Sequence, residues 1–139
     1  GVRPARREPM QALDAVEALA GRGLGGDRYS AGGKRAVTLI QAEHLDILGR
    51  LLGTAAPGPA TLRRNLVVAG VNVLALRKRR FLVGGALLEG TGACDPCSRM
   101  EEALGPGGWN AMRGHGGITA TIVESGAIRR GDLVRALDP

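Results

Sequence analysis

Short runs of apolar residues separated by glycine-rich stretches dominate the pattern of the chain. A run of roughly four to eight residues rich in valine, isoleucine and leucine, or one that alternates apolar with polar positions, predicts a β-strand. By this criterion we expect about seven short strands, at residues 36–40, twice within 65–76, twice within 80–92, and at 118–126 and 133–137. The two glycines that interrupt residues 80–92 suit a hairpin turn or a β-bulge.

Helical periodicity is confined to a few segments. Residues 41–53 repeat alanine or leucine at intervals of three or four positions, which predicts an amphipathic helix that ends at Gly53. Residues 98–104 predict a short helix, and one helical turn is expected around Trp109 inside a glycine-rich loop. Residues 11–22 fit either a helix or a strand, because their apolar positions follow both periods loosely.

The order of these elements indicates the fold class. Strands outnumber helices, and they do not alternate with helices as they do in Rossmann or thioredoxin folds. Many short strands with frequent turns favour a mostly-β fold. We therefore expect a closed or partly closed β-barrel with two or three short peripheral helices. A chain of 139 residues without an internal repeat fits one domain over residues 1–139.

Composition and charge narrow the classes of partner. The net charge is +6, with 17 arginines against two lysines, which favours an anionic ligand. Single-stranded nucleic acid usually needs aromatic residues on which its bases stack, and the chain has only Tyr29, Phe81 and Trp109. We therefore expect no nucleic-acid partner.

The apolar runs also bear on the location of the protein. None approaches the roughly 18 residues that span a bilayer, and the charged stretch at residues 1–10 is not followed by the apolar core of a secretory signal. Two cysteines in a CxxC spacing, without an export signal, are typical of a reducing compartment. The sequence thus predicts a cytoplasmic protein that has no membrane partner.

The two cysteines form the motif CDPC at residues 94–97, for which several kinds of chemistry compete. A structural zinc site needs four ligands. His44 and His115 lie 71 positions apart and supply no second pair of ligands. A thioredoxin-like redox pair expects a βαβ setting, which the strand pattern does not supply.

A further interpretation follows from the residues between the cysteines. Asp95 is a good N-cap and Pro96 suits the first position of a helix, so Cys97 would lie in the first turn. The helix dipole and the backbone N–H groups stabilise a thiolate there, and Arg99 is close in sequence. Such a thiolate is suited to act as a nucleophile or as a metal ligand. The plain alternative is that both cysteines are small buried apolar residues and the Asp-Pro pair only starts a helix.

A second polar motif precedes one of the expected strands. Arg63, Arg64 and Asn65 stand directly before the apolar run LVVAG, where they can clamp a phosphate or a carboxylate. The alternative is a solvated start of the strand. The basic run at residues 77–80 is interpreted as a solvated hairpin tip, and the glycine-rich stretch at residues 23–29 matches no phosphate-binding loop motif.

Four segments of the chain, in this order, resemble the MOSC domain: GLGGDRY, LRRNLVVAG, ALLEGTGACDPC and GHGGITATIVESGAIRRGDLV. The resemblance extends from about residue 6 to residue 137. MOSC domains are found at the C-terminus of molybdenum cofactor sulfurases and as small stand-alone proteins. The resemblance implies a barrel-like, mostly-β fold that binds the molybdenum cofactor, which is a metal-dithiolene pterin with a phosphate.

The resemblance also implies roles for individual residues. Cys97 takes the place of the cysteine that is associated with the metal or with carried sulfur. Arg63 and Asn65 match residues that hold the anionic tail of the cofactor in relatives such as the mitochondrial amidoxime-reducing component, and Arg64 stands between them. Asp95 matches a position that contributes polar contacts in such relatives, but an acid disfavours a nearby phosphate unless it caps the helix instead.

Two functions follow as hypotheses. In the first, the chain is a molybdenum-cofactor-binding oxidoreductase component that reduces N-hydroxylated compounds with electrons from a partner protein, and Cys97 is the metal ligand. In the second, it is a non-catalytic sulfur carrier that holds a persulfide on Cys97 for maturation of a metal-sulfur cofactor. These residues are too few to include the pyridoxal-phosphate domain of the sulfurases, so the second role would need a separate cysteine desulfurase. A plain redox role of the CxxC pair is a third hypothesis.

Overall fold

The computed structural model describes residues 1–5, 9–28, 32–95 and 98–137. Within these residues, eight strands form two sheets, accompanied by four α-helices and one 3-10 helix. The strands are β1 (Ala15–Ala18), β2 (Val37–Gln41), β3 (Leu66–Val68), β4 (Arg80–Val83), β5 (Ala86–Ala93), β6 (Ile118–Glu124), β7 (Gly126–Arg129) and β8 (Val134–Ala136). The helices are α1 (Ala42–Leu52), α2 (Pro59–Leu62), η1 (Val73–Leu76), α3 (Ser98–Leu104) and α4 (Gly108–Met112).

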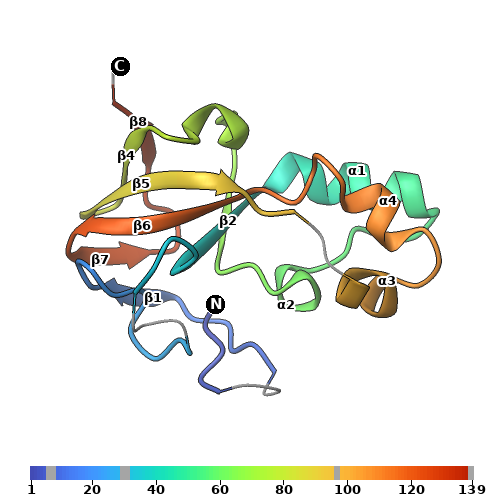
Figure 1. The fold of residues 1–139 in the computed structure, drawn as a ribbon, viewed down its shortest axis with the longest axis horizontal. Helices are drawn as coiled ribbons and strands as arrows, with labels where there is room; N and C mark the ends of the chain where they lie inside the picture. Colours follow the sequence, from blue (N-terminus) through green and yellow to red (C-terminus); the bar gives the residue numbers. More distant parts are fainter. Residues whose placement is uncertain (6–8, 29–31, 96–97, 138–139) are drawn as a thin grey trace.

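The larger sheet has the strand order β3-β2-β6-β5-β4-β8 and runs through the middle of the molecule (Figure 1). β2 is parallel to β3, and the other neighbours in this sheet are antiparallel. Two register shifts in the pairing of β5 with β6, at Leu87/Leu88 and at Gly90/Gly92, help to curl the sheet. β1 and β7 form a separate antiparallel pair. This curled sheet confirms the expected mostly-β, partly closed barrel with a few short helices.

Two groups of buried apolar residues hold the elements together. The larger apolar group lies within the curled sheet and includes Leu39, Phe81 and Ile118. The smaller apolar group joins the helices to the end of β2, and it consists of Ile40, Leu48, Leu62, Met100, Ala111 and Met112. Because neighbouring residues of a strand point to opposite faces, β2 contributes Leu39 to one group and Ile40 to the other. The four α-helices accordingly gather at one end of the sheet (Figure 1).

Most of the expected elements are present in the structure. The predicted helix after β2 is α1, which ends at Gly53 in the left-handed conformation (φ 68°). The hairpin of β4 and β5 turns at the two glycines 84 and 85, as expected. Residues 11–22, which fitted a helix or a strand, contain β1. In the part of the chain that the structure describes, no helix combines the length and the apolar content needed to cross a bilayer.

One expected strand is wrong, and one short helix was not expected. The second strand predicted within residues 65–76 is the 3-10 helix η1, with Val73 and Leu76 buried. The Gln41 side chain accepts a hydrogen bond from the Val73 backbone N (3.2 Å), which holds this segment against the end of β2. Residues 53–64, for which no helix or strand was predicted, contain α2, because Pro59 has a backbone angle suited to the first turn of a helix.

Candidate functional site

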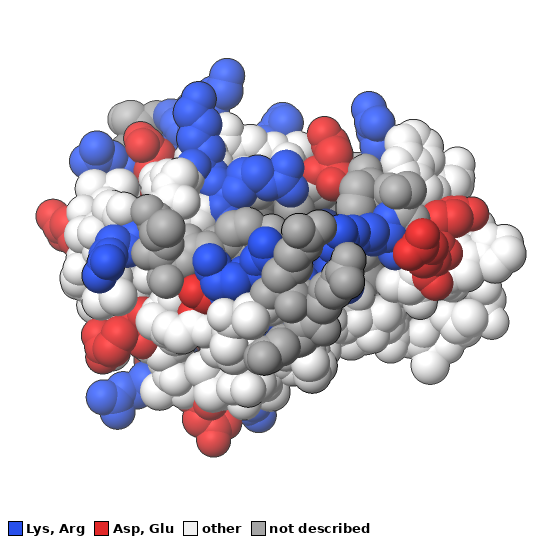
Figure 2. All heavy atoms as spheres, turned by 60° about the horizontal axis from the view of Figure 1, so that its bottom comes forward, with Lys and Arg blue, Asp and Glu red and all other residues white. Residues whose placement is uncertain are grey.

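A cavity of about 600 Å³ lies between the start of β2, the segments of the chain that precede and follow β1, and helices α2 and α3. Its lining is rich in arginine, with Arg3, Arg28, Arg35, Arg63, Arg64 and Arg99. Two aspartates, Asp27 and Asp95, also line it, so positive charge is in excess. On the face that comes forward in Figure 2, Lys and Arg side chains gather in a band, and acidic side chains lie mostly toward its margins. A positive cavity of this kind attracts a small polyanionic ligand.

Arg63 follows α2 and adopts the left-handed conformation (φ 57°, ψ 42°). This conformation ends the helix, because the backbone N–H of Arg63 then donates to the Ala60 carbonyl oxygen (3.2 Å) and that of Arg64 to the Pro59 carbonyl oxygen (3.0 Å). An arginine is strained in this conformation by roughly 1–2 kcal/mol, whereas glycine adopts it readily. The side chain of Arg63 is exposed in the cavity wall. A strained and exposed cation in a cavity is a candidate for ligand binding.

Arg64 is buried (6% exposed), and its guanidinium group is engaged with the backbone. Its Nε donates to the Gly116 carbonyl oxygen (2.8 Å) and its Nη1 to the Leu62 carbonyl oxygen (2.7 Å). A longer contact of 3.4 Å joins Nη2 to the Cys94 carbonyl oxygen. These bonds tie together the end of α2, the loop before β6 and the residue after β5. They give Arg64 a structural role at the site, in addition to the cofactor contact that the sequence predicts.

Asn65 is also buried (8% exposed), and it fixes the parallel pair of strands β2 and β3. Its Oδ1 accepts hydrogen bonds from the backbone N (3.0 Å) and the hydroxyl (3.1 Å) of Thr38. Its own backbone N donates to the Thr38 hydroxyl oxygen (2.9 Å), and its Nδ2 donates to the Gly1 carbonyl oxygen (3.0 Å). Asn65 therefore sets the position from which Arg63 and Arg64 reach the cavity.

The structure brings the described parts of the CDPC motif to the same cavity. Cys94 is buried, lines the cavity, and donates its backbone N–H to the Gly117 carbonyl oxygen (2.9 Å). Asp95 lines the cavity with an exposed side chain. The predicted metal ligand Cys97 lies outside the described residues, and so does Pro96, so the predicted helix cap is not described either. Among the side chains that the structure does describe, no group of three His, Cys, Asp or Glu is placed to hold a metal ion.

The loop before β6 requires glycine where it passes close to β2 and to the residue after β5. Gly117 has a φ of +85°, and a β-carbon there would overlap the carbonyl oxygen of Leu39. A β-carbon on Gly116 would overlap the carbonyl oxygen of Cys94. The GHGG stretch thus lets the backbone pass close to both β2 and the residue after β5, and this contact places the Gly116 carbonyl in reach of Arg64.

The two histidines, distant in sequence, meet beside this loop. His44 of α1 packs edge to face against His115, with the ring centroids 5.2 Å apart. Nδ1 of His115 lies 2.9 Å from the carbonyl oxygen of Ala111. Burial, followed by the charge of His115, lowers the pKa of His44 from its ordinary value of 6.5. The pair joins α1 to the loop after α4.

Four further arginines of the site were not predicted from the sequence: Arg3, Arg28, Arg35 and Arg99. They come from separate segments, and each is one arginine among 17, so no local pattern distinguishes them. Arg99 had one signal, which was its position two residues after Cys97. The buried Asp27 accepts a hydrogen bond from the Arg3 backbone N (2.8 Å) and so joins two of these segments at the cavity.

The fold and the motifs around the cavity agree with a comparison against protein families, in which the MOSC domain matches residues 26–135. The chain belongs to the MOSC domain family. This membership confirms the resemblance that the sequence motifs indicated. MOSC domains are associated with the molybdenum cofactor. The comparison with curated proteins finds no match.

Solved structures show the same MOSC fold at low sequence identity. The crystal structure of the YuaD protein from Bacillus subtilis matches with a TM-score of 0.85 and 19% identity, covering 97% of this chain and 91% of that one. YiiM from Escherichia coli matches with a TM-score of 0.74 and 21% identity, covering 91% and 64%. YiiM from Geobacillus stearothermophilus matches with a TM-score of 0.68 and 18% identity, covering 77% and 56%. This MOSC chain therefore spans less than two thirds of either YiiM chain.

Proposed function

We propose that this MOSC domain binds the molybdenum cofactor in the arginine-lined cavity. The observation that carries the proposal is that exposed arginines from three separate segments, Arg35, Arg63 and Arg99, line one space of about 600 Å³. Such a lining suits the phosphate of the cofactor, because arginine binds phosphate through charge-assisted and often bidentate hydrogen bonds. The volume suits a molecule of this size, since ligand pockets typically measure about 300–1,000 Å³.

In this proposal the polar residues act in two ways. The exposed guanidinium group of Arg63 contacts an anionic group of the cofactor directly. Arg64 and Asn65 are buried and bonded to neighbouring segments, so they keep the wall that carries Arg63 in place. The exposed Asp95 is acidic, so it disfavours a phosphate in direct contact with its own carboxylate.

We assign the metal-ligand role to Cys97, since a thiolate is a soft ligand and Asp95 and Arg99, two residues to either side of it, line the cavity. When bound, the cofactor would supply two-electron chemistry at oxygen. The reaction class that we propose is reduction of N-hydroxylated compounds, which consumes two electrons and two protons and releases water. The electrons come from a partner protein, and the cavity residues bind and orient the anionic groups.

Expression in a molybdenum-replete host, followed by elemental analysis and pterin fluorescence of the purified protein, tests this function. The wild type is expected to carry molybdenum and pterin in near-equal amounts, and Cys97→Ser is expected to lose the metal. Cys94→Ser is the matched control, because it makes the same change at the other cysteine of the motif. Wild type without molybdenum, or equal molybdenum in wild type and Cys97→Ser, would contradict the proposal. A reducible mass increase of one sulfur on Cys97, without pterin, would favour the sulfur-carrier hypothesis instead.

A further inference from the structure

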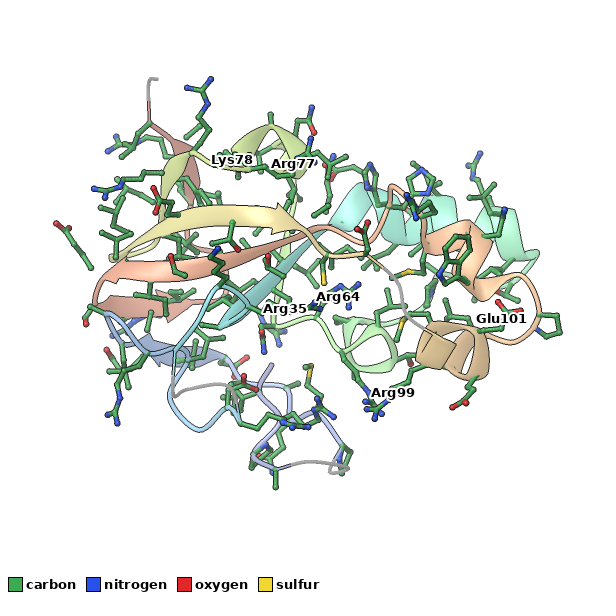
Figure 3. The ribbon with its side chains drawn as sticks, in the orientation of Figure 1. Arg35, Arg64, Arg77, Lys78, Arg99 and Glu101 are labelled. Atoms are coloured by element: carbon green, nitrogen blue, oxygen red, sulfur yellow. The ribbon has the colours of Figure 1, made fainter. Side chains whose placement is uncertain are left out.

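The exposed arginines of the cavity lie on two walls. Arg35 stands just before β2 and belongs to the wall on the side of the sheet, called the sheet wall here. Arg63 ends α2 and Arg99 lies in α3, and these two helices contact each other to form the helix wall, which also includes Asp95. In Figure 3, Arg35 and Arg99 lie on opposite sides of Arg64.

The residue between the two walls is held by backbone carbonyls. Three guanidinium nitrogens of the buried Arg64 donate to the carbonyl oxygens of Gly116, Leu62 and Cys94. Its positive charge is therefore shared with protein acceptors, whereas the cations on either side are exposed. An anion entering the cavity thus meets two separate places with exposed guanidinium groups.

The described residues provide no salt-bridge partner for Arg35, Arg63 or Arg99. Two salt bridges of the described residues, Arg80 with Glu89 (3.7 Å) and Arg130 with Asp14 (3.4 Å), lie outside the cavity. Exposed arginines that repel one another across a shared cavity gain most from a bound anion, because each planar guanidinium group can offer two parallel hydrogen bonds to one phosphate.

We propose that the cavity binds two phosphate-like anions at the same time, one at Arg35 on the sheet wall and one at Arg63 and Arg99 on the helix wall. This proposal rests on the proposed function and deepens it. The molybdenum cofactor carries one phosphate, which occupies one wall. The second anion is either a further phosphate in a nucleotide-linked form of the cofactor or the anionic group of the substrate.

Titration of the cofactor-free protein with inorganic phosphate at low ionic strength tests the proposal. Amide and arginine Nε–H resonances of the ¹⁵N-labelled protein are expected to report two groups of shifts, one around each wall. Arg35→Gln should weaken phosphate binding at the sheet wall by roughly tenfold or more and leave the helix wall within about twofold. Arg99→Gln should have the converse effect. Arg77→Gln, at an exposed position in the basic run outside the cavity, is the matched control and should change neither.

The pattern of losses decides whether there are two anion sites or one. If one substitution abolishes both groups of shifts, or if phosphate perturbs one wall only, the two-anion proposal is wrong. These substitutions are at exposed side chains, and unchanged far-UV circular dichroism verifies that each variant is folded. Because the titration uses cofactor-free protein, its outcome stands whether or not the protein acquires molybdenum in the host.

Repeating the phosphate titration on cofactor-loaded protein identifies the source of the second anion. If one wall still responds to phosphate, the cofactor brings one anionic group and the open wall is the place for an anionic substrate. If neither wall responds, the cofactor brings both anions, and mass spectrometry of the extracted pterin should then show the additional nucleotide. If both walls respond as in the cofactor-free protein, the cofactor is not bound in this cavity and the proposed function is wrong, while two anion sites stand.

Discussion

Arg64→Met is expected to lower the free energy of unfolding by about 3 kcal/mol. Two of the guanidinium contacts, to the carbonyl oxygens of Gly116 (2.8 Å) and Leu62 (2.7 Å), are short, whereas the contact to Cys94 (3.4 Å) is long and counts for less. A buried hydrogen bond to a charged group contributes about 1.5–3 kcal/mol, so two of them contribute about 3–6 kcal/mol. Methionine recovers part of this, because it fills the space without burying a charge.

Urea denaturation followed by far-UV circular dichroism measures this loss. With an m-value of about 1–3 kcal/mol per M, the midpoint should fall by roughly 1–3 M at a constant slope. Arg63→Met is the matched control, since it makes the same change at the adjacent, exposed residue, and it should alter stability by less than about 1 kcal/mol. Equal losses in the two variants, or a loss below about 1 kcal/mol for Arg64→Met, would refute the argument from the guanidinium contacts.

Three further substitutions test other parts of the structure. Gly117→Ala should lower the urea midpoint much more than Gly114→Ala, because a β-carbon overlaps the Leu39 carbonyl oxygen at the first position (φ +85°) and meets open space at the second (φ +79°); equal effects would show that backbone strain alone requires glycine there. Since the folded state lowers the pKa of His44 below 6.5, it binds fewer protons than the unfolded state, so thermal stability should fall as the pH drops below about 6.5. His44→Gln should flatten that part of the curve, and an unchanged slope would contradict the assignment. The carboxylate of Glu101 accepts hydrogen bonds from the backbone N of Trp109 (2.9 Å) and Gly107 (3.1 Å), which lowers its pKa. Stability that depends on this carboxylate should be lost as the pH falls below 4.5, and Glu101→Gln should lower the melting temperature at neutral pH whereas Glu102→Gln should not.

The sequence predicted the elements whose limits are decided by nearby residues. α1 ends at Gly53 because a left-handed residue closes the helix, and that requirement is visible as a glycine after an amphipathic pattern. η1 was not predictable in this way. Its apolar residues suit a strand. In the structure, however, the Leu76 carbonyl oxygen lies so close to Gly90 that a β-carbon on residue 90 would overlap this oxygen. That close approach depends on a contact between distant parts of the chain, which local propensity does not contain.

The candidate site shows the same division between local and distant information. The motif of Arg63, Arg64 and Asn65 was recognisable because three polar residues precede an apolar strand. The different roles of the two arginines were not recognisable from the sequence. Burial of Arg64 and exposure of Arg63 depend on where α2, the GHGG loop and β5 meet. Arg35 was missed because nothing in its neighbourhood marks it, and only the curl of the sheet brings it to the cavity.

The two apolar groups have a consequence for how the domain responds to a ligand. Leu62 and Met100 of the smaller group line the cavity on one side, and Thr38 of β2 lines it between strand residues of the larger group. Separate groups of buried residues of this kind can open independently, as sub-global unfolding units. A ligand that contacts both walls bridges them, so its binding free energy also opposes the separation of one unit from the other. Amide hydrogens of α3 and α4 should then exchange with solvent more slowly in the loaded protein. The bound ligand would couple the unfolding of the helices to that of the sheet.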